Sequence, residues 1–195
     1  MNNAIQKLFP HAMEGGLWHD WHWHMRNALT RLEQLPVPEA AGSEWERARR
    51  VAARYPFRAT PHYLSLVKRW DMRDPILRQC LPDSRELRPE GLREDGLAER
   101  TAMPVPRLVR RYRDRALVLA TSRCATLCRH CFRKHAWRAP PARELSEDAL
   151  AEIVTYLHCN PEIREVILSG GDPLVLEDFH RSEEHTSELQ SLLII

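Results

Sequence analysis

The sequence predicts an α/β chain in which a helical amino-terminal region, residues 1–114, precedes the first strand–helix–strand unit of a parallel sheet, residues 115–180. The earlier region consists of polar and charged stretches broken by prolines, which separate short helices and loops. The later segment holds two short apolar runs on either side of an amphipathic stretch. This order is typical of a βαβ unit.

The strand–helix–strand unit can be followed along the chain. Residues 115–122 and 165–169 are apolar runs, as expected of buried parallel strands. Between them, Ser146 is a suitable helix N-cap and is followed by two carboxylates, which favour the positive end of a helix. Asn160 and Pro161 end the helix. The sequence therefore predicts two parallel strands joined by a right-handed crossover.

Three cysteines lie between the first strand and the helix, and Cys124, Cys128 and Cys131 have the spacing C-x3-C-x2-C. Thiolates at this spacing can hold three irons of a [4Fe–4S] cluster and leave the fourth iron open to a small molecule. The same cysteines with His130 or His135 could instead form a tetrahedral zinc site. Unliganded thiols are the third alternative, and spacing alone favours the cluster.

The other cysteines and the overall composition narrow the class of protein. Cys80 and Cys159 stand alone and are interpreted as inert packed thiols. The first nine residues lack the apolar core of a signal peptide, which predicts a reducing, cytoplasmic location without disulfides. No run approaches the roughly twenty apolar residues of a membrane span. With 29 basic and 27 acidic residues, the net charge of +2 gives no basic field for nucleic acid.

The second strand runs directly into the turn Gly170-Gly171-Asp172-Pro173. Glycines here tolerate positive φ and allow close approach of the backbone to a ligand, which suits a charged amino-acid group at the mouth of a barrel. Alone, this tetrapeptide predicts only a turn. Its place about forty residues after the cysteine loop, with a helix between, favours a binding role.

Further motifs accompany the cysteine loop and the glycine turn. They are Asp20-Trp-His-Trp-His-Met-Arg-Asn27, Thr60-Pro-His-Tyr-Leu64, Asp74-Pro-Ile-Leu-Arg-Gln79, Arg111-Tyr-Arg-Asp-Arg115, Arg129-His130 and Phe132-Arg-Lys-His135. Together they resemble the lysine 2,3-aminomutase family of radical S-adenosylmethionine enzymes over roughly residues 17–178. The resemblance implies a radical SAM partial (β/α) barrel, truncated here, that starts at residue 115, and it favours the [4Fe–4S] cluster over zinc.

The resemblance also implies a reaction. In this family the cluster cleaves S-adenosyl-L-methionine to a 5′-deoxyadenosyl radical, which abstracts a β-hydrogen from an amino acid held as an aldimine of pyridoxal 5′-phosphate. The amino group then migrates from Cα to Cβ while the pyridoxal ring acts as a radical sink. The expected enzyme is a cytoplasmic isomerase and homo-oligomer that converts L-lysine to L-β-lysine.

The motifs leave the substrate open between branches of the family. The block Asp20-Trp-His-Trp23 resembles enzymes that act on free amino acids. Phe132 together with Gly-Gly-Asp-Pro resembles the branch that acts on a lysine of elongation factor P or on glutamate, and Asp95-Gly-Leu-Ala-Glu99 departs from the family's usual Asp-Pro-Leu-x-Glu. A zinc-binding interaction module is the alternative from a different class.

The resemblance assigns roles to individual residues. Arg133 matches the arginine that pairs with the substrate α-carboxylate, a role suited to a planar bidentate side chain. Lys134 matches a position unconnected with the pyridoxal aldimine, and no lysine of this chain is assigned to it. The remaining roles are cluster ligation by Cys124, Cys128 and Cys131, pyridoxal phosphate binding by Arg111, Tyr112 and Arg115, and cofactor binding by Gly170, Gly171 and Asp172.

Two segments at the ends of the chain need separate interpretation. Residues 18–24 alternate tryptophan and histidine, a composition that can bind metals or stack on bases. The three histidines share no i, i+4 face, and the resemblance instead implies a tryptophan-rich helix start packed in the helical region. Residues 181–195 resemble a translated sequencing adapter and are predicted to be a non-native tail. The chain is therefore expected to be a fragment.

Overall fold

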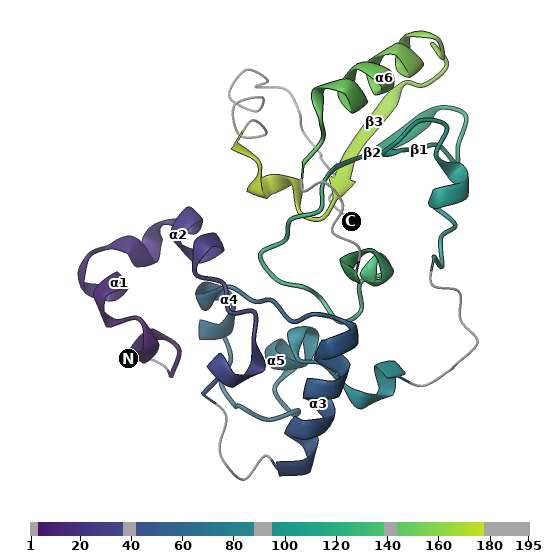
Figure 1. Ribbon diagram of the computed structural model, residues 1–195. Helices are drawn as coiled ribbons and strands as arrows, with labels where there is room; N and C mark the ends of the chain where they lie inside the picture. The colour runs from purple at the N-terminus through teal and green to yellow at the C-terminus, as the bar shows by residue number, and fades with distance from the viewer. Residues whose placement is uncertain (1–3, 37–41, 88–94, 139–143, 178–195) are drawn as a thin grey trace. The chain divides into compact units, whose positions relative to one another are not determined.

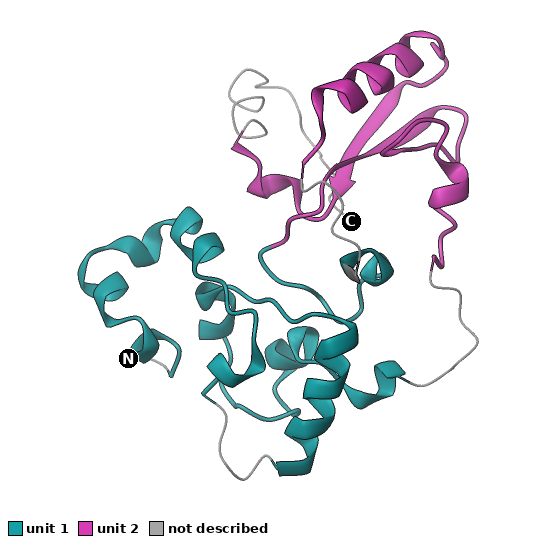
Figure 2. Cartoon of the chain, viewed as in Figure 1, with its two compact units in different colours: residues 1–94, 125–139 teal, residues 95–124, 140–195 magenta. Residues whose placement is uncertain are grey.

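The computed structural model describes residues 4–36, 42–87, 95–138 and 144–177. The chain forms two compact units (Figure 2): unit 1 comprises residues 1–94 and 125–139, and unit 2 comprises residues 95–124 and 140–195. These units do not follow the domain limits at residues 114 and 180, which stay a prediction, because the segment after Cys124 returns to unit 1. The segment 181–195 lies outside the described residues.

Unit 1 is built from short helices, in agreement with the proline breaks (Figure 1). Proline begins α1, α4 and α5, where its missing N–H would have no helical partner. Side-chain oxygens of Asp20, Thr60 and Asp74 accept backbone N–H bonds at the starts of α2, α4 and α5. The elements are η1 (Gln6–Leu8), α1 (Pro10–Glu14), η2 (Leu17–His19), α2 (Trp21–Arg26), η3 (Leu32–Gln34), α3 (Gly42–Arg54), α4 (Pro61–Ser65), α5 (Pro75–Cys80), η5 (Ser84–Leu87) and η7 (Lys134–Arg138).

The core of unit 1 collects buried aliphatic side chains from most of these elements. Cys80 lies in this core with no exposed surface, and burial raises the pKa of its thiol to about 12, so the prediction of an inert packed thiol is confirmed there. The buried members are Ile5, Leu29, Leu32, Leu35, Ala48, Phe57, Ala59, Leu64, Val67, Leu77, Cys80 and Leu81.

Unit 2 contains a three-stranded sheet in the order β1 (Leu108–Val109), β2 (Arg115–Thr121), β3 (Glu165–Gly170). The predicted parallel pairing of β2 and β3 is confirmed, with helix α6 (Glu147–His158) between them in the chain. Ser146 caps α6 by accepting the Ala149 N–H at 3.2 Å, as expected. The antiparallel strand β1 lies in the region predicted to be helical; at two residues it is too short for an alternating pattern to reveal it. Two 3-10 turns, η6 (Arg100–Ala102) and η8 (Pro173–Val175), complete the unit.

The core of unit 2 is small, and two predictions about burial fail there. Ile153 of α6 packs against Leu108, Ala116 and Val118. In contrast, no residue of β3 is buried, because β3 pairs on one side only within the described residues. Cys159, expected to be packed, is exposed at the end of α6. None of the described helices combines the length and the apolarity needed to cross a bilayer.

Candidate functional site

The cysteine loop joins the two units. Cys124 follows β2 in unit 2, whereas Cys128 and Cys131 belong to unit 1. All three cysteines are half-buried, and none of them forms a disulfide. Among the described residues, no three His, Cys, Asp or Glu side chains are gathered into a set that could hold a metal ion. The predicted ligands therefore lie on one loop, and their role in holding a cluster stays a prediction.

The part of the loop that holds Cys128 is bound to the helical unit by backbone hydrogen bonds. The Leu127 N–H donates to the carbonyl of Arg58 at 2.9 Å, and the Arg129 N–H donates to the carbonyl of Gln79 at 2.7 Å. Thr126 also forms an antiparallel bridge with Ala59. These contacts connect residues more than forty positions apart, so local sequence patterns could not have indicated them.

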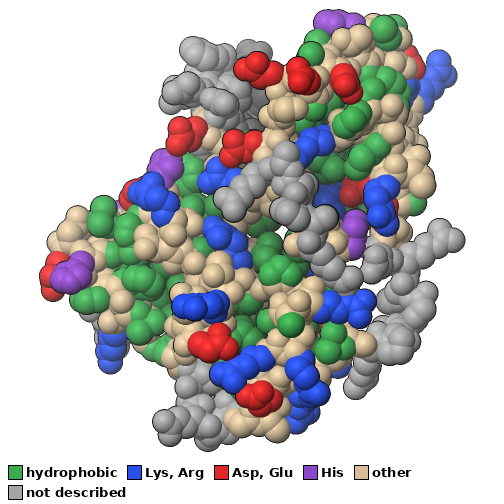
Figure 3. Space-filling model, viewed as in Figure 1, with side chains coloured by type: hydrophobic (Ala, Val, Ile, Leu, Met, Phe, Trp, Pro, Cys, Tyr) green, Lys and Arg blue, Asp and Glu red, His purple; other side chains and the backbone are tan. Residues whose placement is uncertain are grey.

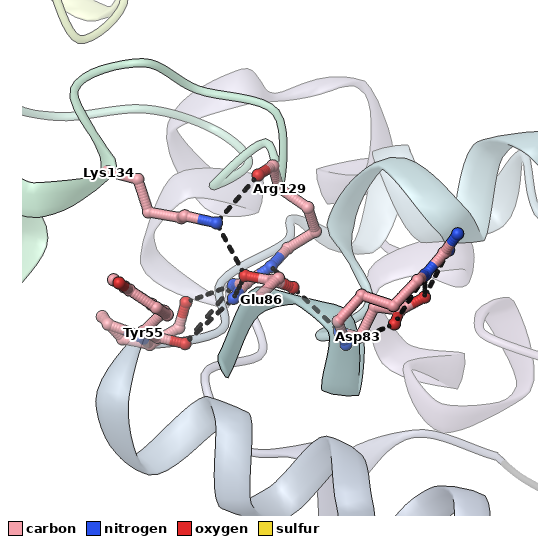
Figure 4. Close-up of polar contacts among 7 residues, drawn as sticks. Tyr55, Asp83, Glu86, Arg129 and Lys134 are labelled. Carbon is pink, nitrogen blue, oxygen red and sulfur yellow. Dashed lines mark hydrogen bonds and ion pairs between the residues drawn. The ribbon is translucent and has the colours of Figure 1, made fainter. Parts of the chain in front are cut away.

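A buried carboxylate holds the next part of the loop (Figure 4). Glu86 of η5 accepts hydrogen bonds from Arg129 Nε at 3.0 Å, from Arg129 Nη2 at 2.7 Å and from Lys134 Nζ at 2.8 Å. Arg129 also donates to the carbonyls of Tyr55 and Pro56. The side chains of Arg129 and Glu86 are only 7% and 10% exposed. The sequence analysis did not identify this network.

The electrostatics of the loop follow from this burial. Burial alone would raise the pKa of Glu86, but hydrogen bonds from Arg129 and Lys134 outweigh it and hold the pKa below its usual range. At Cys128, burial and the neighbouring Cys131 both raise the pKa of the thiol. A bound cation such as iron would favour the thiolate, since coordinating thiols are deprotonated.

The chemistry of the loop fits an iron–sulfur cluster. Three cysteines within eight residues, none of them in a disulfide, are the protein ligands that a cluster with one open iron takes. Two buried polar atoms of the same loop, Thr126 Oγ1 and His135 Nδ1, have no hydrogen-bond partner among the described residues. A buried polar group without a partner is costly, so these atoms indicate that the loop is completed by a group other than its own side chains.

The glycine turn lies at the end of β2, beside the start of the cysteine loop. The Gly171 N–H donates to the Thr121 carbonyl at 2.6 Å, and the Asp172 N–H donates to the Arg123 carbonyl at 2.7 Å. Gly170 has φ of +122°, and a Cβ on either glycine would overlap those carbonyls. The glycines therefore permit close approach of two backbone segments, and their cofactor role stays a prediction.

The predicted phosphate-binding block lies at the opposite end of β2. Arg115 forms ion pairs with Asp114 at 3.3 Å and Glu165 at 3.8 Å, and its guanidinium lies 5.4 Å from the centre of the Tyr112 ring. Arg111 donates to the carbonyl of Leu97 at 2.6 Å. A strand of seven residues is about 20 Å long. The structure thus does not bring this block to the glycine turn, and its role stays a prediction.

Arg133 lies between Cys131 and η7, with its guanidinium 4.6 Å from the centre of the exposed Phe132 ring. Its predicted contact with a substrate carboxylate stays a prediction. Lys134, next to it, is turned toward Glu86 and lies 4.6 Å from the centre of the Tyr55 ring. That Lys134 is unconnected with the pyridoxal aldimine stays a prediction.

The tryptophan and histidine segment has a packing role, as predicted. The buried His24 donates from Nε2 to the Trp18 carbonyl at 2.8 Å and accepts the His62 N–H on Nδ1 at 3.1 Å. The Trp18 and Trp23 rings pack against its imidazole at 4.9 and 5.0 Å between ring centres. With both nitrogens engaged, His24 has no lone pair left for a metal.

Comparison with known proteins identifies the family. Residues 118–193 match the Radical SAM superfamily. The chain is 35% identical to an L-lysine 2,3-aminomutase of Clostridium subterminale over 91% of its own length and 43% of the relative. The chain belongs to the radical SAM aminomutase family. It is also 37% identical to an L-lysine 2,3-aminomutase of Acetoanaerobium sticklandii, over 88% of its own length and 42% of the relative. It is 32% identical to a glutamate 2,3-aminomutase of Clostridioides difficile, over 83% of its own length and 38% of the relative.

This radical SAM chain spans less than half the length of these curated relatives. The superfamily match covers β3 and the glycine turn, and begins within β2, so it includes the strands that flank the cysteine loop. It also extends into residues 181–193, which the sequence predicts to be a non-native tail, and that prediction stays open to test.

Proposed function

We propose that the complete protein is a radical SAM 2,3-aminomutase that moves the amino group of a free amino acid from Cα to Cβ, with L-lysine as its substrate and L-β-lysine as its product. The observation that carries this proposal is the loop of three half-buried cysteines without a disulfide, which backbone hydrogen bonds attach to the helical unit. Two relatives named L-lysine 2,3-aminomutase support the choice of substrate.

The residues of this chain have defined tasks in that proposal. Cys124, Cys128 and Cys131 would hold a [4Fe–4S] cluster, which supplies the electron that cleaves S-adenosylmethionine. Arg133, two residues after the last cysteine, would orient the substrate carboxylate near the cluster through its bidentate guanidinium. Pyridoxal phosphate is the expected second cofactor, and its anchoring lysine is not among the residues assigned here.

A glutamate 2,3-aminomutase is the second candidate. The chain is 32% identical to such an enzyme over 83% of its length. The exposed Phe132 beside Arg133 belongs to the motif that resembles the branch acting on glutamate or on elongation factor P. Supplying L-lysine and L-glutamate separately to the complete enzyme, and identifying the β-amino acid formed, decides between them.

Anaerobic reconstitution tests the cluster directly. The chain is expected to bind about four irons and four sulfides, as a [4Fe–4S] cluster requires, and Cys128→Ala should abolish binding. Cys159→Ala is the matched control, because Cys159 is exposed and outside the loop. One zinc per chain without sulfide would contradict the proposal and favour a zinc-binding module.

A further inference from the structure

We propose that Glu86 is a positioning residue for the cysteine loop: its buried carboxylate holds Arg129 and Lys134 on either side of Cys131 and so sets the shape of residues 129–134 before a cluster binds. This inference rests on the proposed function in that the loop is taken to receive a cluster. Glu86 precedes the loop by about forty residues and touches none of the predicted ligands in any contact described here.

The Glu86 carboxylate binds a side chain at each end of residues 129–134, and we call this arrangement of Glu86, Arg129 and Lys134 the clasp. Arg129 directly follows Cys128 and binds Glu86 through two nitrogens, a bidentate arrangement that fixes orientation as well as distance. Lys134 is three residues after Cys131 and binds the same carboxylate at 2.8 Å. Lys134 Nζ also donates to the carbonyl of Arg129 at 3.2 Å, which joins the two ends of the segment.

Inside this clasp the backbone makes tight turns. The Cys131 N–H donates to the Cys128 carbonyl at 3.0 Å, and the Lys134 N–H donates to the Cys131 carbonyl at 3.2 Å. Such short-range bonds do not by themselves select one conformation of a six-residue segment. The ion pairs to Glu86 supply the long-range constraint, and outer contacts of this kind orient metal ligands.

The burial of the clasp distinguishes it from an ordinary surface ion pair. Glu86 and Arg129 are 10% and 7% exposed, whereas the neighbouring pair of Asp83 and Arg85 in the same turn has Arg85 60% exposed. Buried ion pairs are weak evidence for stability and are better attested as devices that specify one arrangement. Arg85 therefore offers a matched control, because it is next to Glu86 in sequence but its ion pair is with Asp83 and its side chain is exposed.

The experiment compares Glu86→Gln with Arg85→Gln in the full chain. Hydrogen exchange of the amides of residues 129–134 is measured without metal, and iron loss to a chelator is measured after anaerobic reconstitution. In Glu86→Gln we expect both to be faster, and iron loss should be about tenfold faster, the lower end of the effect seen for outer-shell partners of metal ligands. Exchange at Leu64 and Leu81 in the core should not change, which separates loop positioning from general destabilisation. Arg85→Gln should match the parent.

A second variant keeps the test decisive if Glu86→Gln does not fold. Glu86→Leu combined with Arg129→Leu removes both charges, a replacement that proteins often tolerate, and should still release the loop. Its reduced cluster should give a broader electron paramagnetic resonance spectrum than the parent. Parental exchange at residues 129–134 in a folded variant would overturn the inference. Failure of the parent to bind iron and sulfide would instead overturn the proposed function, while the exchange result still decides the role of Glu86.

Discussion

The two units of this chain differ in how completely they bury their apolar surface. Among the described residues, the core of unit 1 holds twelve buried residues, whereas the core of unit 2 holds four. In unit 2, apolar side chains reach the surface around α6 and β3 (Figure 3). They include Leu150 and Val154 of α6 and Val166 and Leu168 of β3, each 40% exposed or more.

Different interactions stabilise the two units. Unit 1 combines a hydrophobic core with buried polar groups, such as Asp74, His24 and the Glu86–Arg129 pair, each of which is hydrogen-bonded. Unit 2 depends on sheet pairing and on the close backbone crossing at the glycine turn. The unit that carries most of the superfamily match is thus the one with less core of its own.

The largest effect is expected from Gly170→Ala. A Cβ at this position would overlap the carbonyl of Thr121 at a φ of +122°, so strain and overlap together should cost about 4 kcal/mol. Amide exchange should lose its protection in β2 and β3 while unit 1 keeps its protection. Gly96→Ala is the control in the same unit, because its Cβ would meet no atom within 4 Å. Equal protection of β3 in both variants would contradict this account.

A smaller effect is expected in unit 1 from Asp74→Ala. The buried Asp74 carboxylate accepts four backbone N–H groups, from Lys68, Arg69, Ile76 and Leu77. Losing a cap and a charged acceptor together should lower the free energy of unfolding by about 2 to 3 kcal/mol. All six tryptophans lie in unit 1, so tryptophan fluorescence during urea unfolding reports this unit alone.

Asp71→Ala is the control for Asp74→Ala. Asp71 forms an ion pair with Arg73 that is largely exposed, and such pairs contribute little to stability. The urea midpoint should stay close to that of the parent. If Asp71→Ala lowers the midpoint as much as Asp74→Ala does, the buried hydrogen bonds are not the source of the effect.

The sequence predicted the elements whose signals are local. The strands at 115–122 and 165–169 and the helix between them appear where expected, because Ser146 and Asn160-Pro161 mark the helix ends within a few residues of its apolar stripe. Strand β1 escaped prediction because its two residues acquire their conformation from pairing with β2. The burial of β3 was predicted wrongly, because an apolar run does not reveal how many neighbours its strand has.

In the candidate site, too, only the part with a local sequence signal was predicted. Cysteine spacing identified the loop. The pairing of Glu86 with Arg129 spans 43 residues, and nothing in the sequence distinguishes these two charged residues from the others. Glu86 lies in a stretch rich in charged residues, yet its side chain is only 10% exposed. Only the folded chain shows which charges are withdrawn from water.

The smallest expected effect concerns pH and again affects unit 1 alone. Burial lowers the pKa of His24, and its Nδ1 is occupied by the His62 N–H, so the folded state resists protonation. The unfolded chain takes up a proton at the ordinary histidine pKa of about 6.5. The stabilising contribution of neutral His24 is therefore complete above that pH and is lost as the pH falls below it. Between pH 7 and pH 5.5, the urea midpoint measured by fluorescence should decline in the parent. His19 is exposed, so His19→Gln is the control and should show the same decline. The decline should be smaller in His24→Gln. The same decline in all three proteins would show that another group carries the pH dependence.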